Sequence, residues 1–340
     1  MVMIKTTNGL SFSQTDGESI LKSSEMAGFS FPYSCLNGRC SSCKCRVIDG
    51  QTEVIGEELG LSQKQKKSGW ILGCVRRALS DITIEVTDIG KFDLFQIRTL
   101  PCKIDSMTFL AQDVIRVCLR FPPASKIEYH PGQYVDVIGK NIESRSYSIA
   151  NASDDRNRVE LHIKKVPNGI MSEYWFNDAR EGDLLRVRGA LGTFFLRDLA
   201  EKKLIFFATG TGAAPVKAML EGLMNIPNSE LPASVDFYWG GRTRSDIYFK
   251  FSEFEFPFRF NFVPVLSRPD PDWLGKVGYV QNVFLSENSN FNKTEVYACG
   301  SDAMIRSARD LLVKSGLSEG SFYSDAFVPS SPSINREGNI

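Results

Sequence analysis

The sequence has no excess of charge of either sign, since 40 Lys and Arg residues balance 40 Asp and Glu residues. A nucleic-acid-binding surface needs a basic face, so we predict no nucleic-acid partner. The chain also lacks any apolar run close to the roughly 20 residues that a membrane span requires, and its first residues contain no apolar signal segment. We therefore expect a soluble, cytoplasmic protein that has no membrane partner.

Histidine is scarce as well, with two residues, whereas half of the eight cysteines fall within the stretch CLNGRCSSCKC at 35–45. In a reducing compartment, clustered cysteines bind metal or perform redox chemistry more often than they form disulfides. Cys35, Cys40 and Cys43 have the spacing C-x4-C-x2-C, and Cys74 follows later in the chain. This spacing is typical of a plant-type [2Fe-2S] cluster held by four thiolates.

Two alternatives to the cluster are a zinc site and a set of buried structural cysteines. Zinc sites usually combine two paired Cys or His units. Cys74 has no second cysteine near it, and neither histidine is close in the sequence. The zinc alternative would make the chain a zinc- and nucleotide-binding sensor module. Cys45, the remaining cysteine of the stretch, is expected to point into a small core.

The chain is long enough for two or three domains, since a single core rarely grows beyond about 250 to 300 residues. Residues 1–92 mix short alternating segments around the cysteines. Residues 98–198 repeat short strands such as RVELHIKKV, a rhythm typical of an antiparallel barrel or sandwich. Residues 199–328 alternate nearly continuous apolar strands such as KLIFFA with amphipathic helices, which indicates an α/β unit with a parallel sheet. The polar tail at 329–340 is predicted to be disordered.

The stretch ESRSYSIAN places an arginine, an aromatic ring and a hydroxyl on one predicted strand. Arg145 can pair with a phosphate there, Tyr147 can lay its ring on a flat heterocycle, and Ser148 can hydrogen-bond a ring nitrogen. Gly169 and Ser172 stand at the start of a predicted helix, whose free N–H groups suit a diphosphate. An ordinary strand and an ordinary capped helix are the alternatives for each motif alone. Together, in this order behind the cysteines, the motifs favour a flavin site.

The stretch LIFFATGTGAAPVKAML combines a buried strand, a Gly-rich turn and a helix. Gly210, Thr211 and Gly212 form the turn, which resembles a dinucleotide fingerprint, although Pro215 stands where the third glycine is expected. A plain strand-to-helix turn is the alternative.

Two further motifs lie where ligands are bound in α/β sheets. Arg242 and Arg244 follow the next strand and can meet adenosine phosphates, unless they are simply solvated. Cys299 and Gly300 lie at the carboxyl end of another predicted strand, next to a predicted helix start. A structural cysteine is the alternative there, but the position favours a role facing the cofactor.

Taken in this order, the cluster loop, R-x-Y-S, G-x-x-S, T-G-T-G-x-x-P and C-G resemble the ferredoxin-fused branch of the ferredoxin-NADP reductase superfamily. The resemblance covers residues 1 to about 328. It implies a multidomain protein: an α+β ferredoxin-like (β-grasp) domain with the [2Fe-2S] cluster, an antiparallel β-barrel domain that binds FAD, and an α/β parallel-sheet domain that binds NADH, with NADPH as the alternative.

The resemblance also implies roles for single residues. FAD would lie between Arg145 and Ser148, with Tyr147 stacked on the isoalloxazine ring, Ser148 near its N5 and the diphosphate at Ser172. The nicotinamide cofactor would enter over the Gly-rich turn and Cys299. Asp325 and Phe327 resemble the acidic and aromatic pair with which many members end near the flavin, although Asp stands where Glu is commoner.

The implied activity is that of an NADH-dependent electron-transfer flavoprotein reductase. NADH gives up a hydride and an iron-sulfur cluster takes one electron at a time, so FAD would mediate between them, with Ser148 and Cys299 holding the reacting atoms. Within the branch, the stretches LHIKKVPNG and SDAFVPS are similar to reductases that serve the dehydrase of CDP-3,6-dideoxyhexose synthesis. Reductase components of aromatic or alkane oxygenases are the alternative, so the expected redox protein partner is a dehydrase or an oxygenase component.

Overall fold

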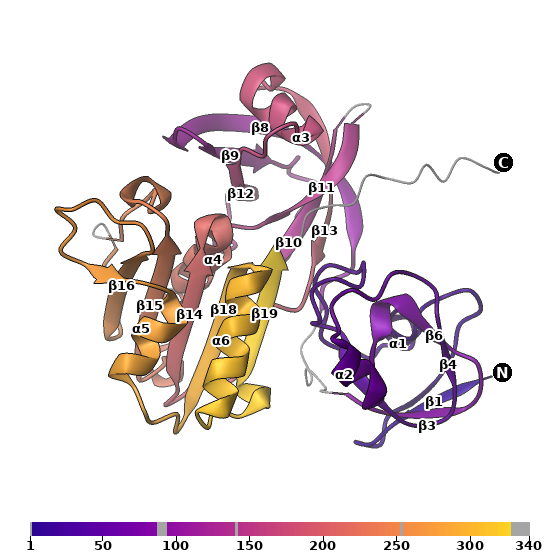
Figure 1. Cartoon of the computed structure of the whole chain (residues 1–340). Coiled ribbons are helices and arrows are strands. Elements are labelled where there is room, and N and C mark those ends of the chain that lie inside the picture. Colours follow the sequence, from indigo (N-terminus) through magenta and orange to yellow (C-terminus); the bar gives the residue numbers. More distant parts are fainter. Residues whose placement is uncertain (1, 87–93, 140–141, 252–253, 328–340) are drawn as a thin grey trace.

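The computed structural model describes residues 2–86, 94–139, 142–251 and 254–327. The tail predicted to be disordered, residues 329–340, lies outside the described residues. Three units follow one another along the chain (Figure 1), and the N-terminal unit lies on the side of the α/β unit that its last strand occupies. No helix in the described ranges combines the length and the apolar character that crossing a membrane demands.

The N-terminal unit is a mixed sheet with two short helices. Its elements are β1 (Met3–Thr6), β2 (Ser11–Ser13), α1 (Ile20–Met26), β3 (Lys44–Asp49), β4 (Thr52–Val54), α2 (Gln63–Lys67), β5 (Trp70–Leu72), β6 (Arg76–Ala78) and β7 (Ile82–Glu85). The main sheet has the order β2-β1-β7-β3-β5, and β1 pairs in parallel with β7. Alternate residues Ile82 and Ile84 are buried, as the predicted strand alternation requires. This small α+β unit presents the cysteine loop between α1 and β3.

The second unit is an antiparallel barrel. Its elements are β8 (Arg98–Ala111), β9 (Val114–Arg120), β10 (Tyr134–Gly139), β11 (Ile142–Ser148), β12 (Arg158–Lys164), α3 (Ile170–Glu173), the π-helical turn η2 (Tyr174–Asp178) and β13 (Leu184–Leu191). The strand order is β11-β10-β13-β8-β9-β12, and a bridge between Ile149 and Leu161 links the ends of this order. Val117 and Leu119 are fully buried inside, while Arg116 and Arg120 face outward, because side chains alternate across a strand.

The third unit is a parallel sheet covered on both faces. Its elements are β14 (Lys203–Thr209), α4 (Ala213–Leu223), β15 (Ser234–Gly241), β16 (Phe260–Leu266), β17 (Lys276–Val277), α5 (Val280–Glu287), β18 (Thr294–Ser301), α6 (Asp302–Lys314) and β19 (Phe322–Phe327). The order is β17-β16-β15-β14-β18-β19, with every pairing parallel. α5 and α6 pack on one face and α4 on the other. The predicted multidomain fold class is therefore confirmed.

The three units meet at the carboxyl end of the parallel sheet. Strand β19 forms the edge of that sheet, and its arrowhead points at the barrel (Figure 1). Ligands in open α/β sheets bind outside the carboxyl ends of the strands. The fold therefore places the barrel strands β10 and β11 and the cysteine loop around the location where such a ligand is expected.

Candidate functional site

A cavity of about 270 Å³ lies where the three units meet. Its walls come from the barrel strand β11, from the turn after β14, from the end of β19 and from the cysteine loop. The lining residues include Cys35, Asn37, Arg145, Tyr147, Ser148, His162, Thr211, Asp325 and Phe327. The cavity thus brings together residues from the three motif groups that the sequence separates by up to about 290 positions.

The four predicted ligand cysteines form two pairs in space. Cys35 lies against Cys40, with the N–H of each residue directed at the sulfur of the other at 3.4 and 3.3 Å. The thiol of Cys43 forms a hydrogen bond with Cys74. Sharing of a proton within each pair lowers the pKa of Cys40 to about 5 and lowers the pKa of Cys74, whereas it raises the pKa of Cys35 and Cys43. Each pair therefore favours one thiolate, the form that binds iron, on Cys40 and on Cys74.

Backbone N–H groups of the loop point at the sulfurs too. Cys35 receives them from Asn37 and Arg39, and Cys74 receives one from Gly38. Such hydrogen bonds stabilise negative charge on sulfur and tune the potential of a cluster. The two thiol pairs match a two-iron cluster, in which each iron takes two thiolates. The four sulfurs lie as two separate pairs, and in the ranges that the structure describes no three His, Cys, Asp or Glu side chains are grouped to hold one metal ion.

Gly38 is required by the backbone of the cysteine loop. Its φ is +74°, and a Cβ there would lie 1.9 Å from the carbonyl oxygen of Glu57. The segment around Glu57 packs on the cysteine loop, since Gly60 N–H donates to Gly38 O at 2.8 Å and Ser41 Oγ donates to Gly60 O. Any larger residue at position 38 would push this supporting segment away.

Cys45 differs from its neighbours in the loop. Its side chain is 2% exposed and packs in the core of the N-terminal unit. Burial raises the pKa of Cys45 to about 12, so its thiol keeps its proton. The structure places Cys45 on β3 inside this core, which agrees with the expectation of a core residue.

The barrel contributes a tyrosine, a serine and an arginine to the cavity. The Tyr147 ring packs edge-on against Trp175, whose Nε1 donates to the Tyr147 hydroxyl at 3.0 Å. Burial raises the pKa of Tyr147 to about 12, so the phenol stays neutral. Ser148 is buried, and its hydroxyl has no hydrogen-bond partner among the described residues. Arg145 donates to Ser144 O at 2.9 Å beside the cavity.

The predicted diphosphate site is built differently from an open helix start. Gly169 is the N-cap of α3, which has only four residues. Ser172 is buried, and its hydroxyl accepts a hydrogen bond from Val166 N–H at 2.9 Å. Val166 lines the cavity, whereas Gly169 and Ser172 stand one layer behind it. Ser172 thus shapes the loop that borders the cavity.

The Gly-rich turn reaches the same cavity through Thr211. Gly210 has a φ of +55°, and a Cβ there would meet open space, so a ligand can approach this backbone closely. Glycine is needed at position 212 for a different reason, because a Cβ there would lie 2.3 Å from the carbonyl oxygen of Cys299. Gly300 likewise leaves room for Thr209, because a Cβ at position 300 would lie 2.4 Å from Thr209 Oγ1. These two glycines allow the turn to pack on the end of β18.

Cys299 is fully buried, and it is absent from the described lining of the cavity. It packs in the core on the α4 face of the sheet, and burial raises the pKa of its thiol well above the usual range. The register pairs it with Ala208 on one side and Asp325 on the other. Cys299 is therefore next to cavity residues without facing the cavity itself in this structure.

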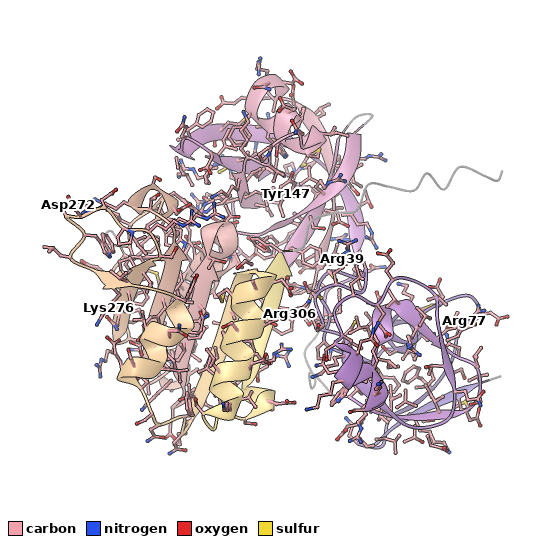
Figure 2. The ribbon with its side chains drawn as sticks, in the orientation of Figure 1. Arg39, Arg77, Tyr147, Asp272, Lys276 and Arg306 are labelled. Atoms are coloured by element: carbon pink, nitrogen blue, oxygen red, sulfur yellow. The ribbon has the colours of Figure 1, made fainter. Side chains whose placement is uncertain are left out.

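The arginines after β15 are tied to carboxylates. Arg244 pairs with Asp272 at 3.0 Å and Asp270 at 3.8 Å, and its guanidinium lies over the Trp273 ring. Figure 2 shows Asp272 at the outer rim of the α/β unit. Asp246 accepts hydrogen bonds from the N–H groups of Arg242 and Thr243, so it fixes the backbone of this loop.

Sequence reasoning missed a buried polar network between barrel and α/β unit. His162 Nε2 bonds Glu160 at 2.8 Å, and its Nδ1 bonds the Tyr248 hydroxyl at 3.0 Å. Burial lowers the pKa of His162, so a neutral ring donates from Nε2 to the carboxylate and accepts at Nδ1. Lys217 of α4 completes the network at 3.1 Å from Glu160. The period-2 pattern of β12 could not reveal it, because His162 stands with Glu160 on the face opposite the barrel-core residues Leu161 and Ile163, where exposure is the ordinary expectation.

The end of β19 joins the cavity to the cysteine loop. Asp325 is 5% exposed and accepts a hydrogen bond from Ser34, which precedes Cys35. Burial raises the pKa of Asp325 to about 6, with the Ser34 hydrogen bond acting in the opposite direction. Phe327 is partly exposed at the rim of the cavity. The acidic and aromatic pair thus stands against both the barrel and the cysteine loop.

These observations fit a flavin and a two-iron cluster as neighbours. The unpartnered Ser148 hydroxyl and the Tyr147 ring line the same cavity as Cys35. A flat, polar ring system is the kind of ligand that such a mixed apolar and polar lining accepts.

Comparisons with known proteins agree with this geometry. Family profiles match the 2Fe-2S iron-sulfur cluster binding domain at residues 4–79, the oxidoreductase FAD-binding domain at 101–196 and the oxidoreductase NAD-binding domain at 206–310. A CDP-6-deoxy-L-threo-D-glycero-4-hexulose-3-dehydrase reductase of Yersinia pestis is 38% identical over 95% of this chain and 97% of its own length.

More distant relatives have the same architecture. The electron transfer component of the xylene/toluene monooxygenase of Pseudomonas putida is 30% identical, over 95% of this chain and 93% of its own. Among solved structures, a cytochrome P450 reductase of Amycolatopsis aligns with a TM-score of 0.75 and 27% identity, over 97% of this chain and 100% of that one.

Proposed function

The chain belongs to the ferredoxin-fused branch of the ferredoxin-NADP reductase superfamily, and on that premise we propose that it delivers electrons from NADH to the dehydrase of a CDP-hexulose pathway. The chain is an oxidoreductase with [2Fe-2S], FAD-binding and NAD-binding domains. The acceptor is inferred from relatives, since the dehydrase reductase shares 38% identity and the oxygenase component 30%.

One observation carries the electron path: Cys35 lines the same cavity as Tyr147 and Ser148. When bound, FAD takes a hydride from NADH and releases its electrons one at a time to an iron-sulfur cluster. Such a relay needs the flavin and the cluster close together, and the shared cavity wall provides this proximity. Cys35 and Cys40 would hold the iron nearer the cavity, and Cys43 and Cys74 the other.

The protein's own residues position and shield the reacting groups. Tyr147, held by Trp175, offers a ring face for the isoalloxazine, and Ser148 offers its hydroxyl to a ring nitrogen. Thr211 and the open backbone at Gly210 would receive the nicotinamide nucleotide on the opposite side. Phe327 covers the rim, so we propose that it yields its place to the nicotinamide ring.

The residue roles predicted from the resemblance stay proposals, with two refinements from the geometry. Ser172 would act on the diphosphate through the loop that it braces at Val166, since its side chain is buried and lies outside the described lining of the cavity. Cys299 would need to turn toward the cavity before it could contact a nicotinamide, because it is fully buried.

The relay is tested by replacing one ligand and one bystander cysteine. Cys74→Ser should abolish NADH-driven reduction of a one-electron acceptor such as cytochrome c, while anaerobic bleaching of the flavin band by NADH continues. Cys45→Ala, in the same unit, should keep the cluster and about two irons with two sulfides per chain. Loss of flavin reduction in Cys74→Ser, or an equal loss of iron in Cys45→Ala, would contradict the proposed path.

The acceptor is tested by reconstitution with purified partners. NADH oxidation coupled to deoxygenation of a CDP-hexulose by its dehydrase is the expected result. Turnover with an aromatic-ring oxygenase and none with the dehydrase would replace this proposal with the oxygenase alternative.

A further inference from the structure

The N-terminal unit is bonded to the other two units by a short stretch that begins just before the first ligand cysteine. Tyr33, Ser34 and Ser42 form hydrogen bonds to residues that follow the barrel and to the last strand of the sheet. We call these three residues, with their partners Thr193, Ser324 and Asp325, the docking seam. A further bond at this place joins the Tyr134 hydroxyl to Ser34 O at 2.6 Å.

Thr193 makes the densest contact of the docking seam. It follows β13 and is 5% exposed. Its Oγ1 accepts from Tyr33 N–H at 2.9 Å and lies 3.1 Å from Tyr33 O, which also accepts from Thr193 N–H at 3.1 Å. One threonine therefore engages both polar groups of the residue that stands two positions before Cys35.

The cysteine loop also covers the free edge of the parallel sheet. β19 pairs only with β18 in the described sheet, so its outer edge offers unpaired backbone groups. Ser42 Oγ donates to Ser324 O at 3.4 Å on that edge. Cys40 packs in the same apolar cluster as Phe322 and Ala326 of this strand. The loop thus acts as a cap on β19.

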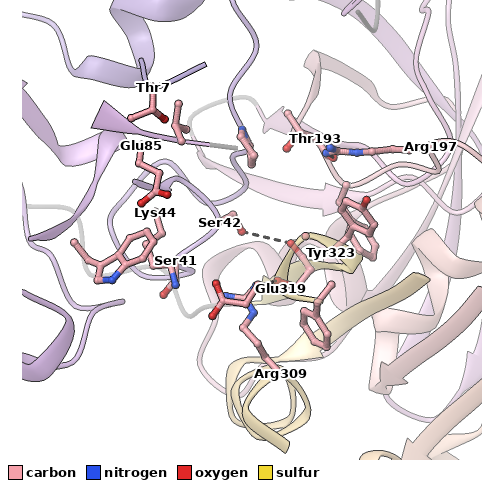
Figure 3. A pocket seen from close by; sticks show the side chains of 17 residues that line it. Thr7, Ser41, Ser42, Lys44, Glu85, Thr193, Arg197, Arg309, Glu319 and Tyr323 are labelled. Atoms are coloured by element: carbon pink, nitrogen blue, oxygen red, sulfur yellow. Dashed lines mark hydrogen bonds between the residues drawn. The ribbon is translucent and has the colours of Figure 1, made fainter. Parts of the chain in front are cut away.

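Beside the docking seam, the N-terminal unit and the α/β unit are separated by open space. A cleft of about 530 Å³ separates them, with Lys44 and Glu85 on one side and Arg309 and Glu319 on the other (Figure 3). Thr193 stands at the border of this cleft, and the dashed line in Figure 3 marks the bond of Ser42 across it. The docked arrangement therefore depends strongly on the few groups of the seam.

We propose that Thr193 is a positioning residue that holds the cysteine loop on the wall of the flavin cavity. This inference rests on the proposed function, because the arrangement matters for electrons that pass from the flavin site to the cluster. Thr193 is outside the described lining of that cavity, so its side chain acts only through Tyr33 and the loop. Without its hydroxyl, the N-terminal unit should undock more often while each unit stays folded.

The substitution Thr193→Val removes the hydroxyl and keeps the shape, and Thr193→Ser keeps the hydroxyl as the matched control. Hydrogen–deuterium exchange of the holoenzyme reports the undocked population directly. In Thr193→Val, amides at 35–43 and in β19 should exchange roughly tenfold faster, as expected when one or two hydrogen bonds are lost. Thr193→Ser should exchange like the wild type, and amides of β1 and β7 should not change.

Stopped-flow reduction by NADH supplies the second readout. In Thr193→Val the flavin band should bleach at the wild-type rate, because the variant leaves the cavity intact. Bleaching of the cluster band should slow only when the undocked form becomes a large fraction, so the double variant with Ser34→Ala should slow more than either single variant.

Three results would overturn the role of Thr193: unchanged exchange at 35–43 in Thr193→Val, equally fast exchange in Thr193→Ser, or equal acceleration in β1 and β7, which would signal unfolding of the whole unit. A wild-type protein whose cluster never bleaches with NADH would instead refute the proposed relay, while the exchange result would still stand on its own.

Discussion

Glu58 should be the most sensitive charged residue of the N-terminal unit. Its carboxylate is 6% exposed, accepts from Leu72 N–H at 2.9 Å and forms a two-pronged pair with Arg76 at 3.1 Å for each bond. Glu58→Gln removes the charge and leaves the half-buried guanidinium of Arg76 without its counter-ion. Breaking a buried pair in this way costs about 3 to 5 kcal/mol. That is a large part of the roughly 5 to 15 kcal/mol by which a domain is stable.

The same unit offers an exposed control. Glu53 pairs with Arg77 on neighbouring strands, and both side chains are about 40% exposed. Surface pairs contribute about 0 to 1 kcal/mol, so Glu53→Gln should change little. With a urea m-value of about 1 to 3 kcal/mol/M, Glu58→Gln should lower the midpoint by roughly 1 M or more.

The visible circular dichroism of the cluster follows this unit alone, which avoids a two-state description of the whole chain. In both variants, flavin fluorescence should report release of FAD from the barrel at the urea midpoint of the wild-type protein. Equal midpoints for the two variants would refute the reasoning that Glu58 anchors the segment beneath the cysteine loop.

Two further predictions concern the other units. Burial holds the pKa of His162 below its usual value, so near and below pH 6.5 the folded state binds fewer protons than the unfolded state. The free energy of unfolding should therefore fall as the pH drops from about 7 to about 5.5. Glu160, whose pKa is lowered to about 2 by His162 and Lys217 against the effect of burial, should add a further loss only below about pH 4.3. His162→Gln should flatten the first decline in urea midpoints, and an unchanged slope would contradict this. In the loop after β15, the double substitution Asp270→Asn and Asp272→Asn frees Arg244. It should lower KM for NADPH up to about fivefold with KM for NADH unchanged, since the closer exposed pair, with Asp272 at 3.0 Å, contributes about 0.2 to 1 kcal/mol. Equal changes for both nucleotides would show that Arg244 does not meet a 2′-phosphate.

The order of the units could be read from the sequence because each leaves a local signature. Four cysteines at fixed spacing, period-2 strands and apolar runs next to a Gly-rich turn each depend on residues close in the chain. The predicted fold class and the family are confirmed on that basis. The residues that line the cavity could be named in part for the same reason, as with Arg145, Tyr147 and Ser148.

The remaining contacts are long-range and leave no local pattern. Nothing in the sequence around Thr193 indicates that it forms hydrogen bonds with Tyr33, which is 160 positions away. Glu160 and Lys217 are polar residues in strands and helices where solvent exposure would be the ordinary expectation, and only the packing of α4 on the barrel brings them together. Cys299 shows the reverse case, because its motif suggested a cavity residue, whereas its side chain is buried in the core on the α4 face; its contact with a nicotinamide stays a prediction.

The place of β19 has a consequence for how the protein is made. A ribosome produces the cysteine loop first and β19 last, since they lie at opposite ends of the described chain. Until β19 joins β18, the loop lacks Asp325 as a partner for Ser34, and Cys40 lacks the apolar surface of Phe322 and Ala326. A nascent chain that stops short of this strand therefore leaves the Cys40 thiol without this cover against oxygen and stray metals. Machinery that inserts iron and sulfide into the finished protein would meet a loop that is held on both sides.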